Sequence, residues 1–234
     1  MIVYGRNPVR EALRGRRAVH AVWATTRAAR LDWLAGVDMT VVEEAALSER
    51  AGTAEHQGVA ARADRYPYAD PAALLAAPAP LVVALDQVTD PHNLGAVCRT
   101  AEVAGATGVV ITERRSAEVT PAVCKASAGA VEHLPVARVQ NLADFLAAAK
   151  EAGCWCYGAS ADAATPYDRP DYRGGVVLVL GAEGKGLRPR VADACDDLIA
   201  LPVRGRIASL NVSAAAAALV YGILQRRAEL DSAS

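Results

Sequence analysis

The chain has 234 residues, of which 53% are hydrophobic, and a formal net charge of −1. This composition predicts a soluble globular protein, and the near-neutral charge argues against nucleic-acid binding through bulk positive charge. No apolar run approaches the roughly 18 to 20 residues that span a bilayer, and the segment MIVYGRNPVREAL lacks the zones of a signal peptide. We therefore expect a cytoplasmic protein that does not enter a membrane.

Residues 1–62 alternate short helices and strands, which predicts a small α/β unit. The expected order is a helix over 8–13, a strand over 19–25, a helix around Leu31, a strand over 39–43, a further helix and a strand over 57–62. Four prolines and an alanine-rich patch between residues 66 and 80 predict a linker with one helical turn. We therefore predict a first domain over residues 1–65, a linker over 66–80 and a second domain over 81–234.

The first thirty residues contain seven arginines and one acid, Glu11, so this segment carries +6 and leaves −7 for the remainder. Two interpretations of this basic segment stay open. It suits docking to phosphate groups at one site, and it equally suits a solvated helix face.

From Leu81 onward, nearly all-apolar strands alternate with helices, which is typical of a parallel sheet buried on both faces. The expected strands cover residues 81–86, 108–112, 133–139, 154–160, 176–181 and 198–202. The expected helices cover residues 94–106, 121–127, 141–153 and 210–227, with a short one before the last strand. The sequence therefore predicts an α/β fold.

The five cysteines are odd in number and lie in apolar stretches, which favours buried, reduced thiols over disulfide bonds. Cys154 and Cys156 would share one face of a strand, where two thiolates can begin a metal site. No further Cys or His has the spacing of a four-ligand zinc site. We therefore predict structural cysteines and no bound metal.

A first motif, LDQVTDPHNLGAVCRTAEVAGA, follows the strand over residues 81–86. Apolar residues recur there at helical spacing and predict the buried face of a helix, namely Leu94, Val97, Cys98 and Ala101. Arg99 falls on the other side of that helix. Asn93 is expected before the helix, in a Pro-His-Asn turn, so loop geometry or another subunit must bring it to Arg99 if the two cooperate.

A second motif, VVLVLGAEGKGLRPRV, ends an apolar strand in a glycine-rich loop that carries Glu183 and Lys185. Its glycines have the spacing G-x-x-G-x-G, which differs from the G-x-G-x-x-G of dinucleotide sites and argues against a nicotinamide oxidoreductase. The loop also lacks the G-K-[ST] of a P-loop, so nucleotide hydrolysis is not expected. We interpret the segment as a binding loop, although glycines also serve tight turns.

A third motif, LIALPVRGRIASLNVSAAAAALVYG, begins with a strand that stops at Pro202. Ser209 is predicted to cap the helix that carries Asn211 and Ser213. A capping serine and a solvated asparagine are common, so this motif alone does not identify a function.

Together, the three motifs over residues 81–228 resemble the SpoU or TrmH family of RNA ribose 2′-O-methyltransferases, within the knotted SPOUT class. The segments YGRNPVREAL and EHQGVAA in residues 1–62 resemble the small substrate-binding domain of RlmB-like members, which methylate a guanosine of bacterial 23S rRNA. The resemblance implies a deep trefoil knot in the C-terminal domain and a homodimer.

The resemblance also implies a cofactor and site residues. S-adenosylmethionine would be bound by Gly181, Leu201 and Leu210, with Ser209 as a neighbour. Methyl transfer would depend on Arg99, assisted by Asn93, Glu183, Ser209 and Asn211. Because a guanidinium is essentially never deprotonated in proteins, Arg99 is either an unusual base or a cation that holds phosphate and stabilises the developing oxyanion.

Three other functions remain as alternatives. The first is a 2′-O-methyltransferase acting on tRNA or on another rRNA site, including one for antibiotic resistance, but the N-terminal domain favours rRNA. The second is a non-catalytic RNA-binding module, although such a module is expected to lose parts of the motif set that is complete here. The third is the nicotinamide oxidoreductase, which the glycine spacing disfavours.

Overall fold

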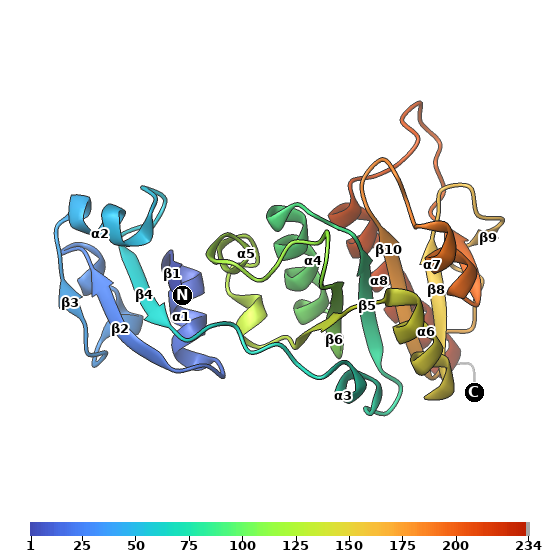
Figure 1. Ribbon diagram of the computed structural model, residues 1–234, viewed down its shortest axis with the longest axis horizontal. Coiled ribbons are helices and arrows are strands. Elements are labelled where there is room, and N and C mark those ends of the chain that lie inside the picture. Colours follow the sequence, from blue (N-terminus) through green and yellow to red (C-terminus); the bar gives the residue numbers. More distant parts are fainter. Residues whose placement is uncertain (233–234) are drawn as a thin grey trace.

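The computed structural model describes residues 1–232, which form two units placed end to end (Figure 1). The N-terminal unit, residues 1–65, contains a four-stranded sheet in the order β1-β4-β2-β3. Its strands are Ile2–Tyr4 (β1), Val19–Ala24 (β2), Thr40–Val41 (β3) and Val59–Ala63 (β4). Its helices are Arg6–Arg14 (α1) and Glu44–Ala51 (α2), with short 3-10 helices at Ala28–Arg30 (η1) and Asp32–Leu34 (η2).

The predicted α/β character of the N-terminal unit is confirmed, with two differences. Strand β1 was not predicted, because three residues are too few to show an alternating pattern. The helix expected around Leu31 is replaced by η1 and η2. Leu31 lies between these two 3-10 helices and has an extended backbone with ψ 130°, so no continuous helix forms there.

The C-terminal unit contains seven strands, all paired in parallel, in the order β7-β6-β5-β10-β8-β11-β9. The strands are Leu81–Asp86 (β5), Gly108–Thr112 (β6), Val136–Val139 (β7), Cys154–Ala159 (β8), Thr165–Pro166 (β9), Gly175–Gly181 (β10) and Asp197–Ala200 (β11). The helices are Pro91–Val103 (α4), Pro121–Ala126 (α5), Leu142–Glu151 (α6), Pro189–Ala194 (α7) and Val212–Ser232 (α8), with a 3-10 helix at Ala130–Glu132 (η3). The parallel sheet is confirmed; residues 233 and 234 of the predicted domain lie outside the described residues.

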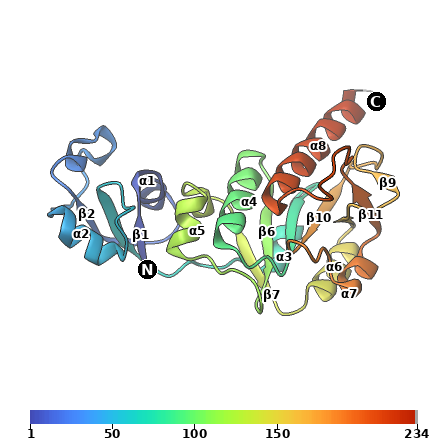
Figure 2. The same ribbon diagram turned by 90° about the horizontal axis from the view of Figure 1, so that it is seen from above.

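Helices cover both faces of the seven-stranded sheet, as the apolar strands require. Helices α4 and α8 lie on one face, and α6 and α7 on the other (Figure 2). Successive residues of one strand point to opposite faces, so Val83 packs toward α4 and α8 whereas Val82 packs toward α6. The strands therefore supply two separate cores.

The segment between the two units is fixed to the C-terminal unit. The hydroxyl of Tyr66 donates to Leu134 O at 3.0 Å, and the hydroxyl of Tyr68 accepts from Val119 N at 2.9 Å. The predicted helical turn is α3, Pro71–Leu75, and the side chain of Asp70 caps its N-terminus.

Helix α1 and strand β1 of the N-terminal unit pack against α5 and η3 of the C-terminal unit. Arg17 is buried at this contact, and its Nε donates to Glu132 Oε2 at 2.8 Å. The backbone comes so close that a Cβ atom on Gly129 would lie 2.7 Å from the Cβ of Glu11. Direct contacts therefore set the relative position of the two units.

Two sequence-based expectations concern the whole chain. Within residues 1–232, no helix is both long and apolar enough to cross a membrane. The trefoil knot stays a prediction from the family resemblance, because strand order alone does not trace it.

Candidate functional site

The three sequence motifs meet at the C-terminal edge of the parallel sheet, where open parallel sheets build their sites. Strand β5 pairs with β10 so that Asp86 lies opposite Gly181, and the loops that follow these strands are therefore neighbours. The N-terminus of α8 reaches the same place, because Asn211 contacts the loop after β10. Segments far apart in the sequence thus meet at one edge of the sheet.

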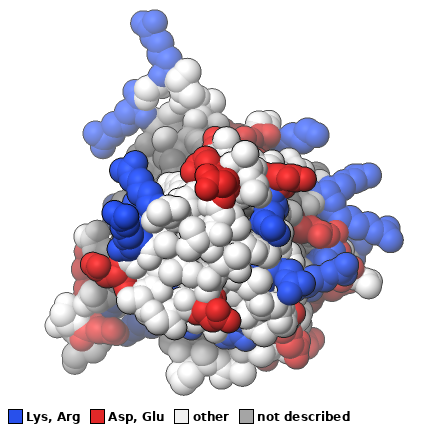
Figure 3. Space-filling view, turned by 90° about the vertical axis from the view of Figure 1, so that its left-hand side faces the viewer, with Lys and Arg blue, Asp and Glu red and all other residues white. Residues whose placement is uncertain are grey.

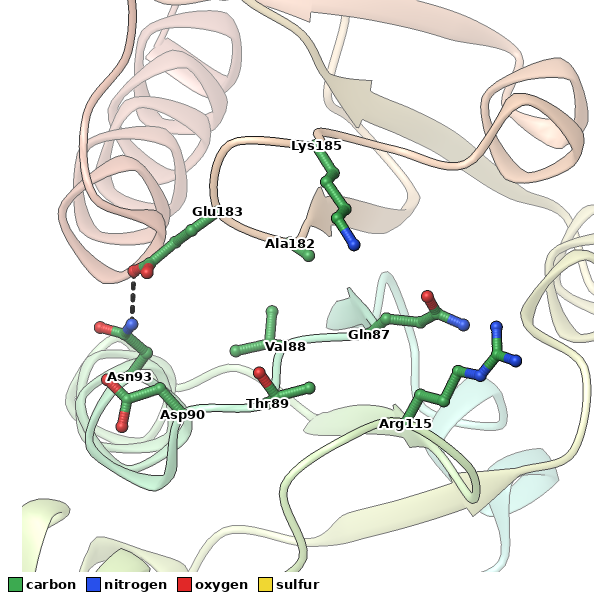
Figure 4. Close-up of a pocket in the computed structure, with 9 residues that line it drawn as sticks. All are labelled: Gln87, Val88, Thr89, Asp90, Asn93, Arg115, Ala182, Glu183 and Lys185. Carbon is green, nitrogen blue, oxygen red and sulfur yellow. Dashed lines mark hydrogen bonds between the residues drawn. The ribbon is translucent and has the colours of Figure 1, made fainter.

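Glu183 is the centre of a small polar cluster. Its Oε1 accepts a hydrogen bond from Asn93 Nδ2 at 2.5 Å (Figure 4) and another from Asn211 Nδ2 at 2.8 Å. The Oδ1 of Asn211 in turn accepts from the backbone N–H of Ser213 at 2.8 Å. The structure thus brings together three of the five residues expected to take part in catalysis, one from each motif.

Two local expectations about these residues were wrong. Asn93 lies inside α4, as the third residue after its capping Asp90, and not in a turn before the helix. Pro91 at the first helical position explains this, because its fixed φ suits a helix start and its missing N–H costs nothing there. Asn211 caps α8, and Ser209 does not, because the helix begins two residues later than expected.

Arg99 is exposed on α4 and, within residues 1–232, its side chain makes no hydrogen bond or ion pair. The predicted buried face of the same helix is confirmed, since Leu94, Val97, Cys98 and Ala101 are all buried. Arg99 is therefore available to a ligand, but the structure does not bring it into the Glu183 cluster.

Gly181 is required by the packing of its own loop. A Cβ atom there would lie 2.1 Å from the backbone carbon of Gly186 and 2.4 Å from the nitrogen of Leu187. Because backbone cannot give way as a flexible side chain can, any residue other than glycine must displace the loop that carries Glu183.

The loop over residues 201–211 holds the other residues expected to bind a cofactor. Leu201 is half-buried, whereas Ser209 and Leu210 are exposed, and Leu210 retains 57% of its accessible surface. Within residues 1–232, the backbone of residues 202–209 makes no hydrogen bond. The loop therefore offers unpaired backbone groups beside exposed apolar side chains, which suits a ligand that is partly polar and partly apolar.

Sequence reasoning missed the pair formed by Asp86 and Arg188. The carboxylate of Asp86 is buried and accepts from Arg188 N at 2.9 Å and from Arg188 Nε at 2.7 Å. This pair ties the end of β5 to the end of the glycine-rich loop. The available signal was an acid at the end of the otherwise apolar strand LVVALD.

Comparison with known proteins identifies the chain. Residues 80–221 match the SpoU rRNA Methylase family, and residues 2–69 match the family described as RNA 2′-O ribose methyltransferase substrate binding. A TrmH family tRNA/rRNA methyltransferase of Bacillus subtilis is 39% identical over 96% of this chain and 95% of its own length. The chain belongs to the SpoU, or TrmH, family of RNA methyltransferases.

Two further relatives agree with this membership. A tRNA/rRNA methyltransferase of Synechocystis is 40% identical over 97% of this chain, which spans 62% of that relative. The crystal structure of an AdoMet-bound rRNA methyltransferase from Sinorhizobium meliloti is 25% identical with a TM-score of 0.82, covering 96% of this chain and 86% of that one.

The basic segment of this SpoU family member is not one continuous patch. Arg17 is buried at the contact between the units, and Arg10 and Arg14 pair with Glu11. Figure 3 shows the outer face of the N-terminal unit with a mostly uncharged centre and with blue and red groups mixed around its rim. Arg6 and Arg16 are exposed and donate to backbone carbonyls, of Gln57 and His133 respectively. Arg27 and Arg30 are exposed, and their side chains make no hydrogen bond or ion pair within residues 1–232.

Four of the five cysteines are buried in the cores of the C-terminal unit, and Cys195 is half-buried. Cys154 and Cys156 share the buried face of β8, as predicted, and Trp155 between them is exposed. Burial raises the pKa of the Cys156 thiol to about 12. Within residues 1–232, no three His, Cys, Asp or Glu side chains are grouped so that they could hold a metal ion.

Proposed function

We propose that this chain transfers the methyl group of S-adenosylmethionine to a ribose 2′-hydroxyl of RNA, with a guanosine in 23S rRNA as substrate. The observation that carries this proposal is the convergence of Asn93, Glu183 and Asn211 beside the loop over residues 201–211. Family membership supports methyl transfer to RNA, and the AdoMet-bound relative supports the methyl donor. The activity belongs in the cytoplasm.

The residues for holding the donor are Gly181, Leu201 and Leu210, with Ser209 beside them. The unpaired backbone groups of residues 202–209 fit the polar ends of the donor, and exposed Leu210 fits its apolar surface. When bound, the donor supplies an electrophilic methyl group on a positively charged sulfur.

The chain's own residues position and activate the ribose. Two amide donors fix Glu183 Oε1, and Glu183 Oε2, which has no partner within residues 1–232, accepts a hydrogen bond from the 2′-hydroxyl. Arg99 contributes a positive charge on the exposed side of α4, outside the Glu183 cluster of its own chain. In the proposed homodimer it therefore holds the adjacent phosphate and stabilises the developing oxyanion at the site of the partner subunit. Positioning of this kind supplies much of the acceleration of an in-line attack.

The N-terminal unit acts in this proposal as the substrate-binding domain. The side chains of Arg27 and Arg30 are exposed and make no hydrogen bond or ion pair within residues 1–232, so their replacement by Gln should weaken RNA binding and flatten its salt dependence. Arg14→Gln is the matched control, because Arg14 is exposed and already paired with Glu11. Point variants are preferable to deleting residues 1–65, because deletion would leave Glu132 without its partner.

A homodimer is part of the same proposal. The loop over residues 202–210 exposes three large apolar side chains, namely Val203, Ile207 and Leu210. Exposed apolar groups of this kind are typical of interaction surfaces. Light scattering at micromolar concentration should give the mass of two chains, and a monomer at that concentration would contradict the dimer.

The decisive experiment is methyl transfer from labelled S-adenosylmethionine to purified 23S rRNA and, separately, to tRNA. We expect label in 23S rRNA at one nucleotide, resistant to alkaline cleavage on its 3′ side because the 2′-oxygen is methylated. Glu183→Gln, which keeps the shape of the side chain, is the inactive control. Label in tRNA alone, or on a base, would overturn the substrate or the chemistry respectively.

A further inference from the structure

A cavity of about 530 Å³ lies over three adjacent strands, β6, β5 and β10, and opens beside Glu183. Asn93 and Glu183 form one end, whereas Gln87, Arg115 and Lys185 form the other (Figure 4). The first end belongs to the cluster described above. The second end has no role in the reaction described so far.

The second end consists almost entirely of hydrogen-bond donors. Arg115 and Lys185 carry donors and no acceptor, and the amide of Gln87 carries both. Within residues 1–232, none of these three side chains makes a hydrogen bond or an ion pair. The donors are therefore free to bind a ligand.

The backbone of this end is held in a costly conformation. Gln87 and Arg115 have positive φ angles of 60° and 59°, which non-glycine residues seldom adopt. The two loops are joined by a hydrogen bond from Ala117 N to Val88 O at 2.9 Å, and the hydroxyl of Thr112 donates to Arg114 O at 2.9 Å. Strain of this kind is concentrated at sites that bind ligands.

We infer that Arg115, Lys185 and Gln87 bind the base of the target nucleotide and select guanine. This inference rests on the proposed function, because the ribose of that nucleotide must lie at the Glu183 end. Guanine presents two adjacent acceptors, O6 and N7, which match the two-donor edge of an arginine. Adenine and cytosine place an amino donor in the corresponding position, where it would face the donors of Arg115 and Lys185.

The methyl donor is a poorer occupant of this cavity. None of the residues of the loop over 201–211 lines it, and residues 202–209 of that loop have backbone groups without hydrogen bonds. The sulfonium carries a positive charge, and two free cations would repel it.

The test replaces Arg115 by Gln and measures methyl transfer to RNA that carries guanine, adenine, uracil or cytosine at the mapped position. Wild-type protein should prefer guanine, and Arg115→Gln should lower kcat/KM for guanine so that the guanine-to-adenine ratio falls about tenfold or more. Arg114→Gln is the matched control, because Arg114 is the exposed neighbour that does not line the cavity. An unchanged ratio, or an equal loss on all four substrates as expected for a phosphate contact, would overturn the inference.

A second measurement does not depend on catalysis. Calorimetric titration with guanosine and adenosine monophosphates should show tighter guanosine binding by wild-type protein and loss of that difference in Arg115→Gln, with unchanged affinity for S-adenosylmethionine. A weakened methyl-donor affinity would instead place the donor in this cavity and overturn the inference. Methyl transfer to RNA with no guanine preference would leave the methyltransferase activity intact and overturn the inference. Guanine-selective binding without methyl transfer would refute the proposed function and leave the cavity as a guanine-binding site only.

Discussion

Arg17 and Glu132 form a buried ion pair across the boundary between the N-terminal and C-terminal units. Their side chains retain 2% and 1% of their accessible surface, and Arg17 Nη1 also donates to Asp64 O at 3.0 Å. Each charge is satisfied by the other unit, so separating the units would leave Glu132 without its cation. The ion pair between Arg17 and Glu132 therefore both orients the N-terminal unit and contributes to the stability of the folded protein.

Removal of one partner of this pair should be strongly destabilising. Arg17→Met leaves the carboxylate of Glu132 buried and unpaired, which should cost about 3–5 kcal/mol in the free energy of unfolding. The double variant Arg17→Met, Glu132→Leu should recover much of that loss, because neither charge remains. Urea denaturation of the three proteins measures this, with Arg27→Met as a control, because Arg27 is exposed and makes no hydrogen bond or ion pair within residues 1–232. A single variant as stable as wild type would show that the pair does not hold the units together.

Gly181→Ala should disrupt the glycine-rich loop. The added Cβ atom would lie 2.1 Å from the backbone carbon of Gly186, so the loop must move. We expect the affinity for S-adenosylmethionine to fall about tenfold or more, equivalent to about 1.4 kcal/mol, together with a lower Tm. Gly36→Ala is the control, because a Cβ atom there meets nothing within 4 Å and the residue lies in the N-terminal unit, so strain at its positive φ should lower Tm without changing the donor affinity. Calorimetry that gives equal affinities for Gly181→Ala and wild type would contradict this role.

Arg99→Ala should preserve the fold and donor affinity, since the side chain is exposed and unpaired within residues 1–232. Methyl transfer should fall by roughly a hundredfold or more, the scale of losing a proton-transfer or oxyanion contact. Arg99→Lys keeps the charge but not the planar fork, so substantial activity in that variant would favour electrostatic stabilisation over a base role. Full activity of the alanine variant in single-turnover assays would remove Arg99 from the site.

The buried thiols predict a loss of stability in alkali. Burial raises the pKa of Cys98 and of Cys156 to about 12, whereas an unfolded cysteine titrates near about 8.5. The folded protein therefore holds these protons more tightly, so the stabilisation is complete below about pH 8.5 and is lost as the pH rises toward 12. Denaturation at pH 8 and pH 10 should show a lower unfolding free energy at pH 10.

The same thiols should be protected from alkylation, because the thiolate is the reactive form. At pH 8, iodoacetamide should modify Cys98 and Cys156 far more slowly in the folded protein than in urea. Modification of folded protein at the urea rate would show that these thiols are not buried as described.

The sequence alone determined the elements whose signal is local. The strand over Leu81–Asp86 and the strand over Gly108–Thr112 were predicted with the bounds observed, because each is a continuous apolar run buried on both faces. Helix α4 was predicted from its buried stripe, and its exposed Arg99 with it. The three motifs were sufficient to predict the family, because they are defined by residue types and by their order along the chain.

The tertiary structure decided which distant residues meet. Glu183 is bound by Asn93, which precedes it by 90 residues, and by Asn211, which follows it by 28. No periodicity encodes that contact, because it depends on the strand order β6-β5-β10, which places the ends of three strands side by side. The same order joins the loops of Gln87 and Arg115 into one cavity wall, and the packing of α1 against η3 buries Arg17 at the contact between the two units. The type of a residue determines its chemistry, and the tertiary structure determines which other residues and ligands it can contact.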